Sequence, residues 1–407
     1  MKRVFIVDEH SSSKQNGIGT FVKELFEGLR PFARTNLISF NDDVKFYRKE
    51  RVNDSWNYRI PVYCNGAFLN NAAIGVALLK NEIADNENNI FIVNHFPCIE
   101  LLENLRQFFP LSKIVFVIHN QQWVSILQGD DDLFRKLVMS HHLTEEEEML
   151  RNQLIACFHM EKRMYMLADA VVSLAADTTS LLKEVYAISQ NKIFEIPNGT
   201  NILLNNQDKS KEALRKELLI ETSDKILLYT GRTAKIKGLD VILKSFNEVV
   251  KRHPEARLVI AGQVFRLNEF AAICPNGVSR IIYTGLLPKE RLKDWYTVAD
   301  IGLLCSYHEQ CSYTGIEMLA YGIPVIASDA PCVRNMFQEG INARIVSIGD
   351  KTNDLFFVKN LEHVMCDVLN MSEKEITLMR QKARKYYEKR YMSSRMIDNY
   401  SSMLESL

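Results

Sequence analysis

Short apolar runs of strand length alternate with amphipathic helical segments along almost the whole chain. Strands that are buried on both faces read as continuous apolar runs, and a strand, a helix and a second strand in succession favour parallel pairing. The alternation therefore predicts an α/β fold built on parallel sheets. The predicted strands are Arg3–Val7, Ile90–Val93, Ile114–Ile118, Ala170–Leu174, Ile193–Ile196, Ile226–Thr230, Leu258–Ala261, Ile281–Thr284, Ile301–Cys305, Val325–Ser328 and Arg344–Val346.

The number of predicted strands exceeds what one Rossmann-type sheet usually holds, so the pattern predicts two such domains. A length of 407 residues agrees with this division. The polar stretch 201–211, which follows the turn-forming Pro197-Asn198-Gly199, is the best candidate for a linker. In the first half, 142–168 is predicted as one long helix in which Thr144 and Glu147 form a capping box.

The composition limits the possible compartments and partners. With 50 basic and 50 acidic residues, the formal net charge is zero and gives no reason to expect a nucleic-acid partner. The eight cysteines show no C-x-x-C pair or zinc-like spacing, which favours free thiols in a reducing cytoplasm and no bound metal. The first apolar run is too short for a signal peptide, and no window approaches the ~18 apolar residues of a membrane span. The basic and aromatic segment Lys45–Arg51 leaves peripheral membrane contact open, although such segments are more often solvated surface.

Two carboxylates lie eight positions apart across a strand-loop-helix junction in the second half. Glu309 follows the predicted strand Ile301–Cys305, and Glu317 lies in the first turn of a predicted helix, Thr314–Tyr321. Ligands of open α/β sheets collect at the carboxyl ends of the strands. Both carboxylates are therefore candidates for a binding site. For Glu317 an alternative stays open, since Thr314-x-x-Glu317 is also a capping box that would only close its own helix.

A second candidate element follows the strand Ile226–Thr230. Gly231 ends the strand, and Arg232 and Lys237 precede the predicted helix Leu239–Val250. Arginine offers a bidentate fork, lysine a mobile point charge, and a helix start adds backbone N–H donors. This arrangement suits a nucleotide diphosphate, although exposed cations are common at helix starts.

In the first half, two strand ends carry candidate residues. Gly17, Ile18 and Gly19 open a helix after the first strand, where the glycines let a ligand approach the backbone. A glycine-bearing tight turn with no ligand is the alternative. His119 stands directly after Ile114–Ile118, and His95, a weaker candidate for an acceptor site, follows Ile90–Val93.

The order of these motifs resembles the retaining family-4 glycosyltransferases. The resemblance rests on the Glu-x7-Glu pair followed by Gly-Ile-Pro-Val-Ile at 322–326, and on the Gly-Arg-x-x-x-x-Lys-Gly element at 231–238. It implies the GT-B fold, in which two Rossmann-like domains face each other across a cleft and a C-terminal helix crosses back to the N-terminal domain. The implied domains are an acceptor domain at 1–198, joined by the helix 385–407, and a nucleotide-sugar donor domain at 199–384.

The resemblance also implies roles for individual residues. Arg232 and Lys237 would hold the donor diphosphate, Glu309 the sugar hydroxyls and Glu317 the ribose, with His119 beside the donor sugar. Gly17, Ile18 and Gly19 would border the phosphates or the acceptor. Family members often carry Gly-Phe-Gly after the first Glu, whereas this chain has Gln310-Cys311-Ser312, which restricts the backbone. The further residues expected to bind the donor are Gly231, Gln310, Cys311, Ser312, Tyr313, Thr314, Leu286 and Leu287, the last two facing the base.

The implied activity is retaining, metal-independent transfer of a hexose-type sugar from a nucleotide-diphosphate sugar. UDP- or GDP-sugars are the expected donors, and a glycan, a lipid-linked molecule or a peptide the expected acceptor. The variant loop is similar to that of a bacterial subgroup. A cytoplasmic enzyme is expected, and peripheral contact at the inner face of the membrane stays open. Two alternatives stay open: another GT-B enzyme, such as a nucleotide-sugar epimerase or a phosphorylase, and a non-catalytic GT-B partner subunit of another transferase.

Overall fold

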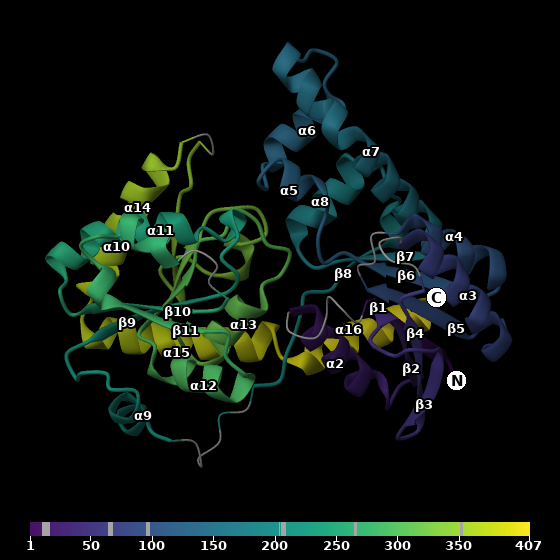
Figure 1. The fold of residues 1–407 in the computed structure, drawn as a ribbon, viewed down its shortest axis with the longest axis horizontal. Helices are drawn as coiled ribbons and strands as arrows, with labels where there is room; N and C mark the ends of the chain where they lie inside the picture. The colour runs from purple at the N-terminus through teal and green to yellow at the C-terminus, as the bar shows by residue number, and fades with distance from the viewer. Residues whose placement is uncertain are drawn as a thin grey trace. The chain divides into compact units, whose positions relative to one another are not determined.

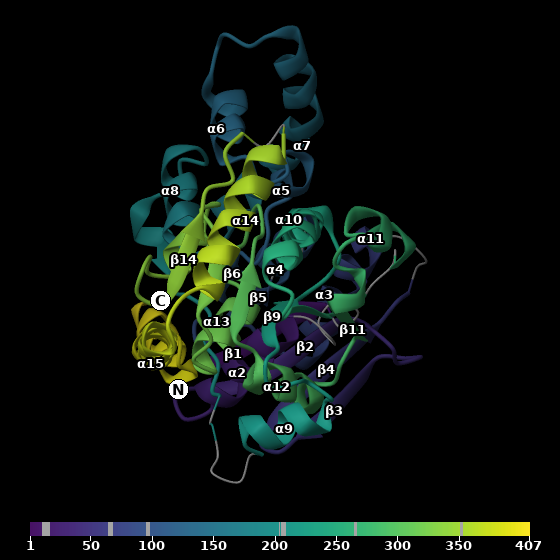
Figure 2. The ribbon, with the colours of Figure 1, turned by 90° about the vertical axis from the view of Figure 1, so that its left-hand side faces the viewer.

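The computed structural model describes residues 1–9, 17–63, 68–94, 98–202, 204, 209–263, 267–350 and 353–407. The chain forms two compact units (Figures 1 and 2). The N-terminal unit comprises Met1–Leu127, Asp131–Asn201 and Met392–Leu407, and the C-terminal unit comprises Gln128–Asp130 and Ile202–Tyr391. Each unit contains a mainly parallel sheet with helices, so the predicted α/β fold with two Rossmann-like domains is confirmed.

The sheet of the N-terminal unit has the strand order β3-β4-β2-β1-β5-β6-β7-β8. All neighbours are parallel except the antiparallel pair β3 and β4. The first strand has β2 on one side and β5 on the other, so the strand order reverses beside β1. The strands are β1 (Arg3–Glu9), β2 (Arg34–Asp42), β3 (Arg48–Val52), β4 (Ser55–Pro61), β5 (Asn89–Asn94), β6 (Lys113–Val117), β7 (Ala170–Ser173) and β8 (Ile193–Glu195).

Three of these strands, β2, β3 and β4, were not predicted. In β2, buried and half-buried positions alternate along most of the strand, which interrupts the apolar run that marks a central strand. The edge strand β3 reads Arg-Lys-Glu-Arg-Val, and charged side chains of this kind protect an edge from further pairing. The basic part of Lys45–Arg51 therefore lies largely in a strand, with Arg48 58% and Arg51 68% exposed in their side chains.

Helices cover this sheet, and the longest of them confirms the predicted cap. The Thr144 side chain accepts from the Glu147 backbone N–H and the Glu147 carboxylate accepts from the Thr144 N–H. This capping box starts the helix at Glu145, three residues later than predicted. The helices of the N-terminal unit are α2 (Gly17–Leu29), α3 (Phe68–Glu82), α4 (Ile99–Phe108), α5 (Trp123–Ile126), α6 (Asp131–Met139), α7 (Glu145–Leu167), α8 (Ala176–Glu184) and α16 (Ser393–Ser406).

The C-terminal helix α16 packs against α2 within the N-terminal unit (Figure 1). The two helices approach each other closely at Gly28, because a Cβ atom there would lie 2.4 Å from Ile397 Cδ1. Residues 385–391 stay in the C-terminal unit, and the chain passes between units after Asn201 and after Tyr391.

The sheet of the C-terminal unit is six-stranded, parallel throughout and ordered β11-β10-β9-β12-β13-β14. The order reverses between β9 and β12, which defines a topological switch point. The strands are β9 (Lys225–Thr230), β10 (Ala256–Ala261), β11 (Ile281–Gly285), β12 (Ile301–Leu304), β13 (Val325–Ser328) and β14 (Ala343–Val346). The helices are α9 (Lys211–Glu217), α10 (Leu239–Arg252), α11 (Leu267–Ile273), α12 (Lys289–Val298), α13 (Tyr313–Ala320), α14 (Leu355–Leu369) and α15 (Glu373–Arg390).

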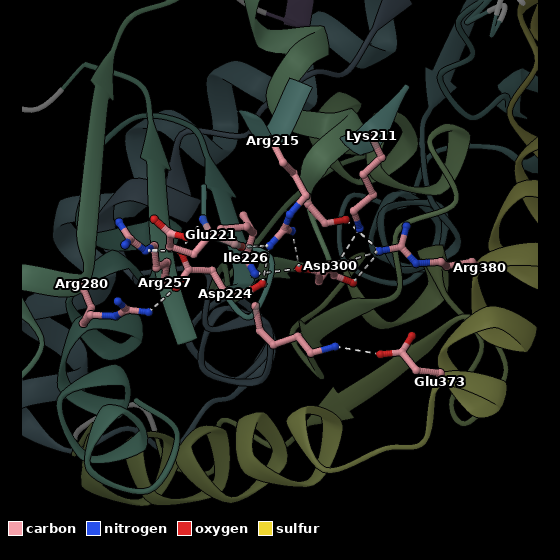
Figure 3. Close-up of polar contacts among 12 residues, drawn as sticks. Lys211, Arg215, Glu221, Asp224, Ile226, Arg257, Arg280, Asp300, Glu373 and Arg380 are labelled. Atoms are coloured by element: carbon pink, nitrogen blue, oxygen red, sulfur yellow. Dashed lines mark hydrogen bonds and ion pairs between the residues drawn. The ribbon is translucent and has the colours of Figure 1, made fainter. Parts of the chain in front are cut away.

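An ionic cluster around Asp300 fastens the amino end of this sheet to its helices (Figure 3). The Asp300 carboxylate accepts from the Ile226 backbone N–H at 2.8 Å and pairs with Lys211 Nζ at 2.6 Å. Arg215 and Arg380 approach the same carboxylate to 3.5 Å. The cluster joins α9, β9 and α15. It lies at the amino ends of the strands, whereas the candidate residues Lys237 and Glu309 follow the carboxyl ends.

In the part of the chain that the structure describes, every helix is too short or too polar to cross a membrane.

Candidate functional site

The carboxyl ends of β9 and β12, on either side of the switch point, bring together a lysine, a carboxylate and a serine. Lys237 Nζ lies 2.7 Å from Glu309 Oε1, and Ser306 Oγ donates to the same oxygen at 2.8 Å. Only 10% of the Glu309 side chain and 23% of the Lys237 side chain are exposed. Lys237, which was predicted to bind the diphosphate, and Glu309, which was predicted to bind the sugar, are therefore in direct contact.

A close backbone approach explains how Lys237 reaches this position. The 3₁₀ turn η2 (Lys235–Lys237) ends at Gly238, whose φ of 71° lies in the left-handed region. A Cβ atom at Gly238 would lie 2.0 Å from the Cys305 carbonyl oxygen, so only glycine lets the turn rest on the end of β12. The Tyr307 N–H also donates to the Ile236 carbonyl at 2.8 Å. These contacts attach the lysine-bearing turn to the loop that carries Glu309.

Arg232 lies on the same stretch but is differently placed. It follows Gly231, whose N–H donates to the Ala261 carbonyl of the neighbouring strand at 3.0 Å. The Arg232 carbonyl accepts from the Tyr229 hydroxyl at 2.6 Å, which fixes the backbone, while the residue itself is exposed. Among the described residues its guanidinium forms no ion pair, which leaves the cation available to a ligand.

Glu317 belongs to a second polar group beside the first. Tyr296 Oη, on α12, donates to Glu317 Oε2 at 2.6 Å and contacts Thr230 Oγ1 at 3.1 Å. Thr230 Oγ1 in turn lies 3.3 Å from Thr314 Oγ1. Burial raises the pKa of the Glu317 carboxyl above its ordinary value, while the Tyr296 hydroxyl and, more weakly, the Lys289 cation oppose the rise.

The capping-box alternative for Glu317 is wrong. Helix α13 begins at Tyr313, one residue earlier than predicted, and its N-cap is Ser312, whose hydroxyl accepts from the Gly315 N–H. The Glu317 carboxylate bonds to Tyr296 instead of its own helix start. The carboxylate therefore has no capping role.

The loop between the two carboxylates is packed inward. Gln310, Cys311, Ser312 and Tyr313 are all less than 10% exposed, and Thr314 is half-buried. The Ser312 N–H donates to Met336 Sδ at 3.3 Å. Packing of these buried residues thus fixes the loop.

Leu286 and Leu287 lie at a different strand end. They follow β11, two strands away from β9, after Gly285, whose φ is 69°. Leu286 is 57% exposed. The two leucines are at the same edge of the sheet as Lys237 but are not among the residues that contact it.

In the N-terminal unit, the candidate residues gather where α2 begins. Gly17, Ile18 and Gly19 form its first turn, and the preceding loop with Asn16 lies outside the described residues. His119 follows β6, and its ring meets the Phe21 ring of α2 edge-on at 4.6 Å. The structure thus brings His119 and the start of α2 together. His95 lies outside the described residues.

Ser306 and Tyr296 were missed by the sequence reasoning. Ser306 directly follows a predicted strand, so its position at a strand end was a usable signal. Tyr296 lies on a helix and contacts Glu317, which is 21 positions later in the sequence. No local sequence pattern predicts that contact. In the described ranges, no group of three or more His, Cys, Asp or Glu residues is arranged to hold a metal ion.

Comparison with known sequences supports a transferase assignment for the C-terminal unit. Residues 210–364 match the family model described as glycosyl transferases group 1. A D-inositol 3-phosphate glycosyltransferase of Nocardia farcinica is 29% identical over 205 residues, or 48% of this chain and 45% of the relative. The alpha-monoglucosyldiacylglycerol synthase of Streptococcus pneumoniae is 31% identical over 135 residues, or 33% and 30%. The matches span less than half the length of these relatives.

Comparison with solved structures covers the whole chain. A sucrose-phosphate synthase from Thermosynechococcus elongatus superposes with a TM-score of 0.76 at 16% identity, covering 100% of this chain and 99% of that one. The pneumococcal O-GlcNAc transferase, solved with UDP and GlcNAc, gives 0.71 at 12% identity, covering 100% and 99%. At these identities the likeness shows the fold. Residues 210–364 are therefore a glycosyl transferase group 1 domain, in a chain that has the GT-B fold.

Proposed function

We propose that this chain is a retaining, metal-independent glycosyltransferase that moves a hexose-type sugar from a nucleotide-diphosphate sugar to an acceptor hydroxyl. The observation that carries the proposal is the contact of Lys237 with Glu309 at the switch point between β9 and β12. A cation and a carboxylate at one strand-end site match the two ends of a sugar diphosphate. The cation suits the diphosphate and the carboxylate suits the sugar hydroxyls.

In this proposal the C-terminal unit binds the donor. Arg232 and Lys237 neutralise the charge that grows on the leaving diphosphate, the interaction that differs most between ground state and transition state. Glu309 accepts hydrogen bonds from the sugar hydroxyls, and Glu317, held by Tyr296, accepts from the ribose. Lys237 is paired with Glu309 before any donor arrives, so the bound diphosphate must draw the ammonium toward itself.

Departure and attack take place on the same face of the sugar, which retains the anomeric configuration without a covalent enzyme intermediate. Glu309 is therefore a binding and electrostatic group and not a nucleophile. Its hydrogen bonds with Lys237 and Ser306 support this role, because both contacts stabilise a carboxylate that accepts.

The acceptor would bind at the N-terminal unit, near the first turn of α2 and His119. A glycan, a lipid-linked molecule or a peptide is the proposed acceptor class, and a UDP- or GDP-sugar the proposed donor. The likeness to a transferase solved with UDP and GlcNAc supports UDP. A cytoplasmic location is part of the proposal, and peripheral membrane contact stays open. The described cysteines, none of which is in a disulfide, support a reducing compartment.

The test is a transfer assay with a panel of UDP- and GDP-sugars and candidate acceptors. Release of the nucleotide should depend on an acceptor, and NMR of the product should show the anomeric configuration of the donor. Lys237→Ala serves as the control with lowered activity. Transfer to phosphate or water alone, or epimerised donor with no transfer, would assign the chain to another GT-B reaction. Nucleotide binding without turnover on any acceptor would favour a partner subunit.

A further inference from the structure

A groove on the C-terminal unit, separate from the residues described above, is lined by cations. It has a volume of about 570 Å³ and lies between the last turns of α15 and the segment 338–341. This volume is within the range of small-molecule sites. The polar side chains along the helix are Lys382, Lys385, Tyr386, Lys389 and Arg390.

The lysines of this groove share one face of α15. Lys382, Lys385 and Lys389 are spaced three and four positions apart, which places them side by side on a helix. Like charges at this spacing repel one another and destabilise the helix. Because the whole chain has zero formal net charge, such a local excess of positive charge is a property of the groove and not of the composition.

The carboxylates nearby do not neutralise these lysines. Glu388 pairs with Arg384 at 2.8 Å, and Glu339 pairs with Arg344 at 2.9 Å. Among the residues that the structure describes, none of the three lysines forms an ion pair. An anion in the groove would relieve their mutual repulsion.

The helix terminus explains only part of the pattern. Cations in the last turn interact favourably with the negative end of the helix dipole, which accounts for Lys389 and Arg390. The effect falls off within that turn. Lys385 and Lys382 lie further back, so their presence in the same groove needs another reason.

The end of the groove is held in a fixed shape. Arg390 Nη1 donates to the Tyr386 hydroxyl at 3.1 Å, and the guanidinium lies 5.6 Å from the centre of the Tyr391 ring. Tyr391 Oη in turn donates to the Met336 carbonyl at 3.4 Å. A cation held in this way is preorganised for an anionic ligand.

We propose that this groove binds a phosphate-bearing anion, either a small phosphorylated molecule or an acidic lipid headgroup. Lysines act as point charges on phosphate oxygens, and Arg390 adds a fork with a fixed direction. The proposal does not depend on the transferase reaction, because it uses none of the donor-site residues.

The first experiment measures binding of inorganic pyrophosphate by calorimetry. The donor site also attracts a diphosphate, so the measurement is made in the Arg232→Ala/Lys237→Ala protein, where that site is disabled. One pyrophosphate should still bind, and adding Lys385→Ala and Lys389→Ala should weaken this binding at least about 10-fold. Both lysines are exposed, so the fold should tolerate the changes, which thermal unfolding verifies.

A matched control adds Lys359→Ala and Lys374→Ala instead, two exposed lysines of the same unit that do not line the groove. These should leave pyrophosphate binding unchanged. Equal weakening by both pairs would mean that only diffuse positive charge attracts the anion, and would overturn the proposal.

The second experiment separates the two sources of phosphate. Co-sedimentation is measured with phosphatidylglycerol vesicles and with phosphatidylcholine vesicles. Binding to the acidic vesicles alone, lost in Lys385→Ala/Lys389→Ala, would identify a lipid headgroup. Groove-dependent binding of pyrophosphate without vesicle binding would identify a soluble ligand. If neither probe bound in a way that depended on these lysines, the proposal would be wrong.

Discussion

Lys237 Nζ and Glu309 Oε1 lie 2.7 Å apart although 72 positions separate the two residues in the chain. The pair joins the ends of two strands that are neighbours only because the order of the sheet reverses between them. Each partner orients the other where both side chains are mostly buried, so the cation is held beside the carboxylate at the ends of the two strands.

Replacing Lys237 by alanine should lower turnover about 100-fold, since one preorganised electrostatic partner of the leaving group is lost. Steady-state rates with the preferred donor measure the effect. Lys235→Ala is the control, because Lys235 is exposed on the same turn and has no contact with Glu309. Equal losses in both variants would show that the turn matters as a whole and that Lys237 has no special role.

Replacing Tyr296 by phenylalanine should raise KM for the donor several-fold and change kcat less. The hydroxyl opposes the burial that raises the pKa of Glu317, so its loss raises that pKa further. The ionised carboxylate of Glu317 is the better acceptor for ribose hydroxyls. As the pH is lowered, the variant should therefore begin to lose donor affinity at a higher pH than the wild type does. The pH profile of kcat/KM measures the shift. Tyr283→Phe, elsewhere in the same unit, should leave the profile in place.

Glu161 should make the stability of the protein depend on pH. Its carboxyl is 3% exposed, and burial raises its pKa to about 7, against the hydrogen bonds from Tyr186 and the Gln122 N–H. The folded state therefore binds a proton more tightly than the unfolded state. The stabilisation is fully present below the ordinary carboxyl pKa of 4.5 and is lost as the pH rises through 7.

Glu161→Gln should remove this dependence. At ~1.4 kcal/mol per pKa unit, the free energy of unfolding of the variant, relative to that of the wild type, should increase by about 3 kcal/mol between pH 4.5 and pH 8. The amide keeps an acceptor for Gln122 and offers a donor to the Tyr186 oxygen. Urea unfolding across this pH range measures the difference in unfolding free energy. Glu146→Gln, on the exposed face of α7, is the control. Parallel curves for wild type and Glu161→Gln would contradict the argument.

Two glycines with nearly the same positive φ should differ in their tolerance of alanine. Gly238 and Gly285 have φ values of 71° and 69°. A Cβ atom at Gly285 meets nothing within 4 Å, whereas one at Gly238 would lie 2.0 Å from the Cys305 oxygen. Gly285→Ala should cost about 1 kcal/mol from the left-handed conformation alone, and Gly238→Ala roughly 1–3 kcal/mol more. Similar unfolding free energies for both variants would mean that the contact with Cys305 is not tight.

The sequence predicted the sheet of the C-terminal unit better than the outer strands of the N-terminal unit, for a physical reason. A strand such as Ile226–Thr230 is buried on both faces and reads as a continuous apolar run. The edge strand Arg48–Val52 is solvated and charged, and its composition resembles a loop. The two strands differ in burial. A local sequence pattern predicts a strand clearly only when both of its faces are buried.

Lys237 and Glu309 could be proposed because each follows a strand of the same sheet, and strand ends at a switch point converge. The contact of Tyr296 with Glu317 depends on how α12 packs beside α13, which single-sequence spacing does not encode. The position of Ser312 as the N-cap of α13 was missed because the capping-box pattern Thr314-x-x-Glu317, two residues later, predicted a later helix start.

The most direct test of a nucleotide-sugar site at β9 and β12 is thermal unfolding with UDP, GDP, ADP and CMP. A nucleotide at 100 times its dissociation constant adds ~2.7 kcal/mol to the stability, enough to raise Tm by several degrees. UDP or GDP should raise the Tm of the wild-type protein, and this shift should be lost in Lys237→Ala. Absence of any shift, or a shift that the variant retains in full, would contradict it.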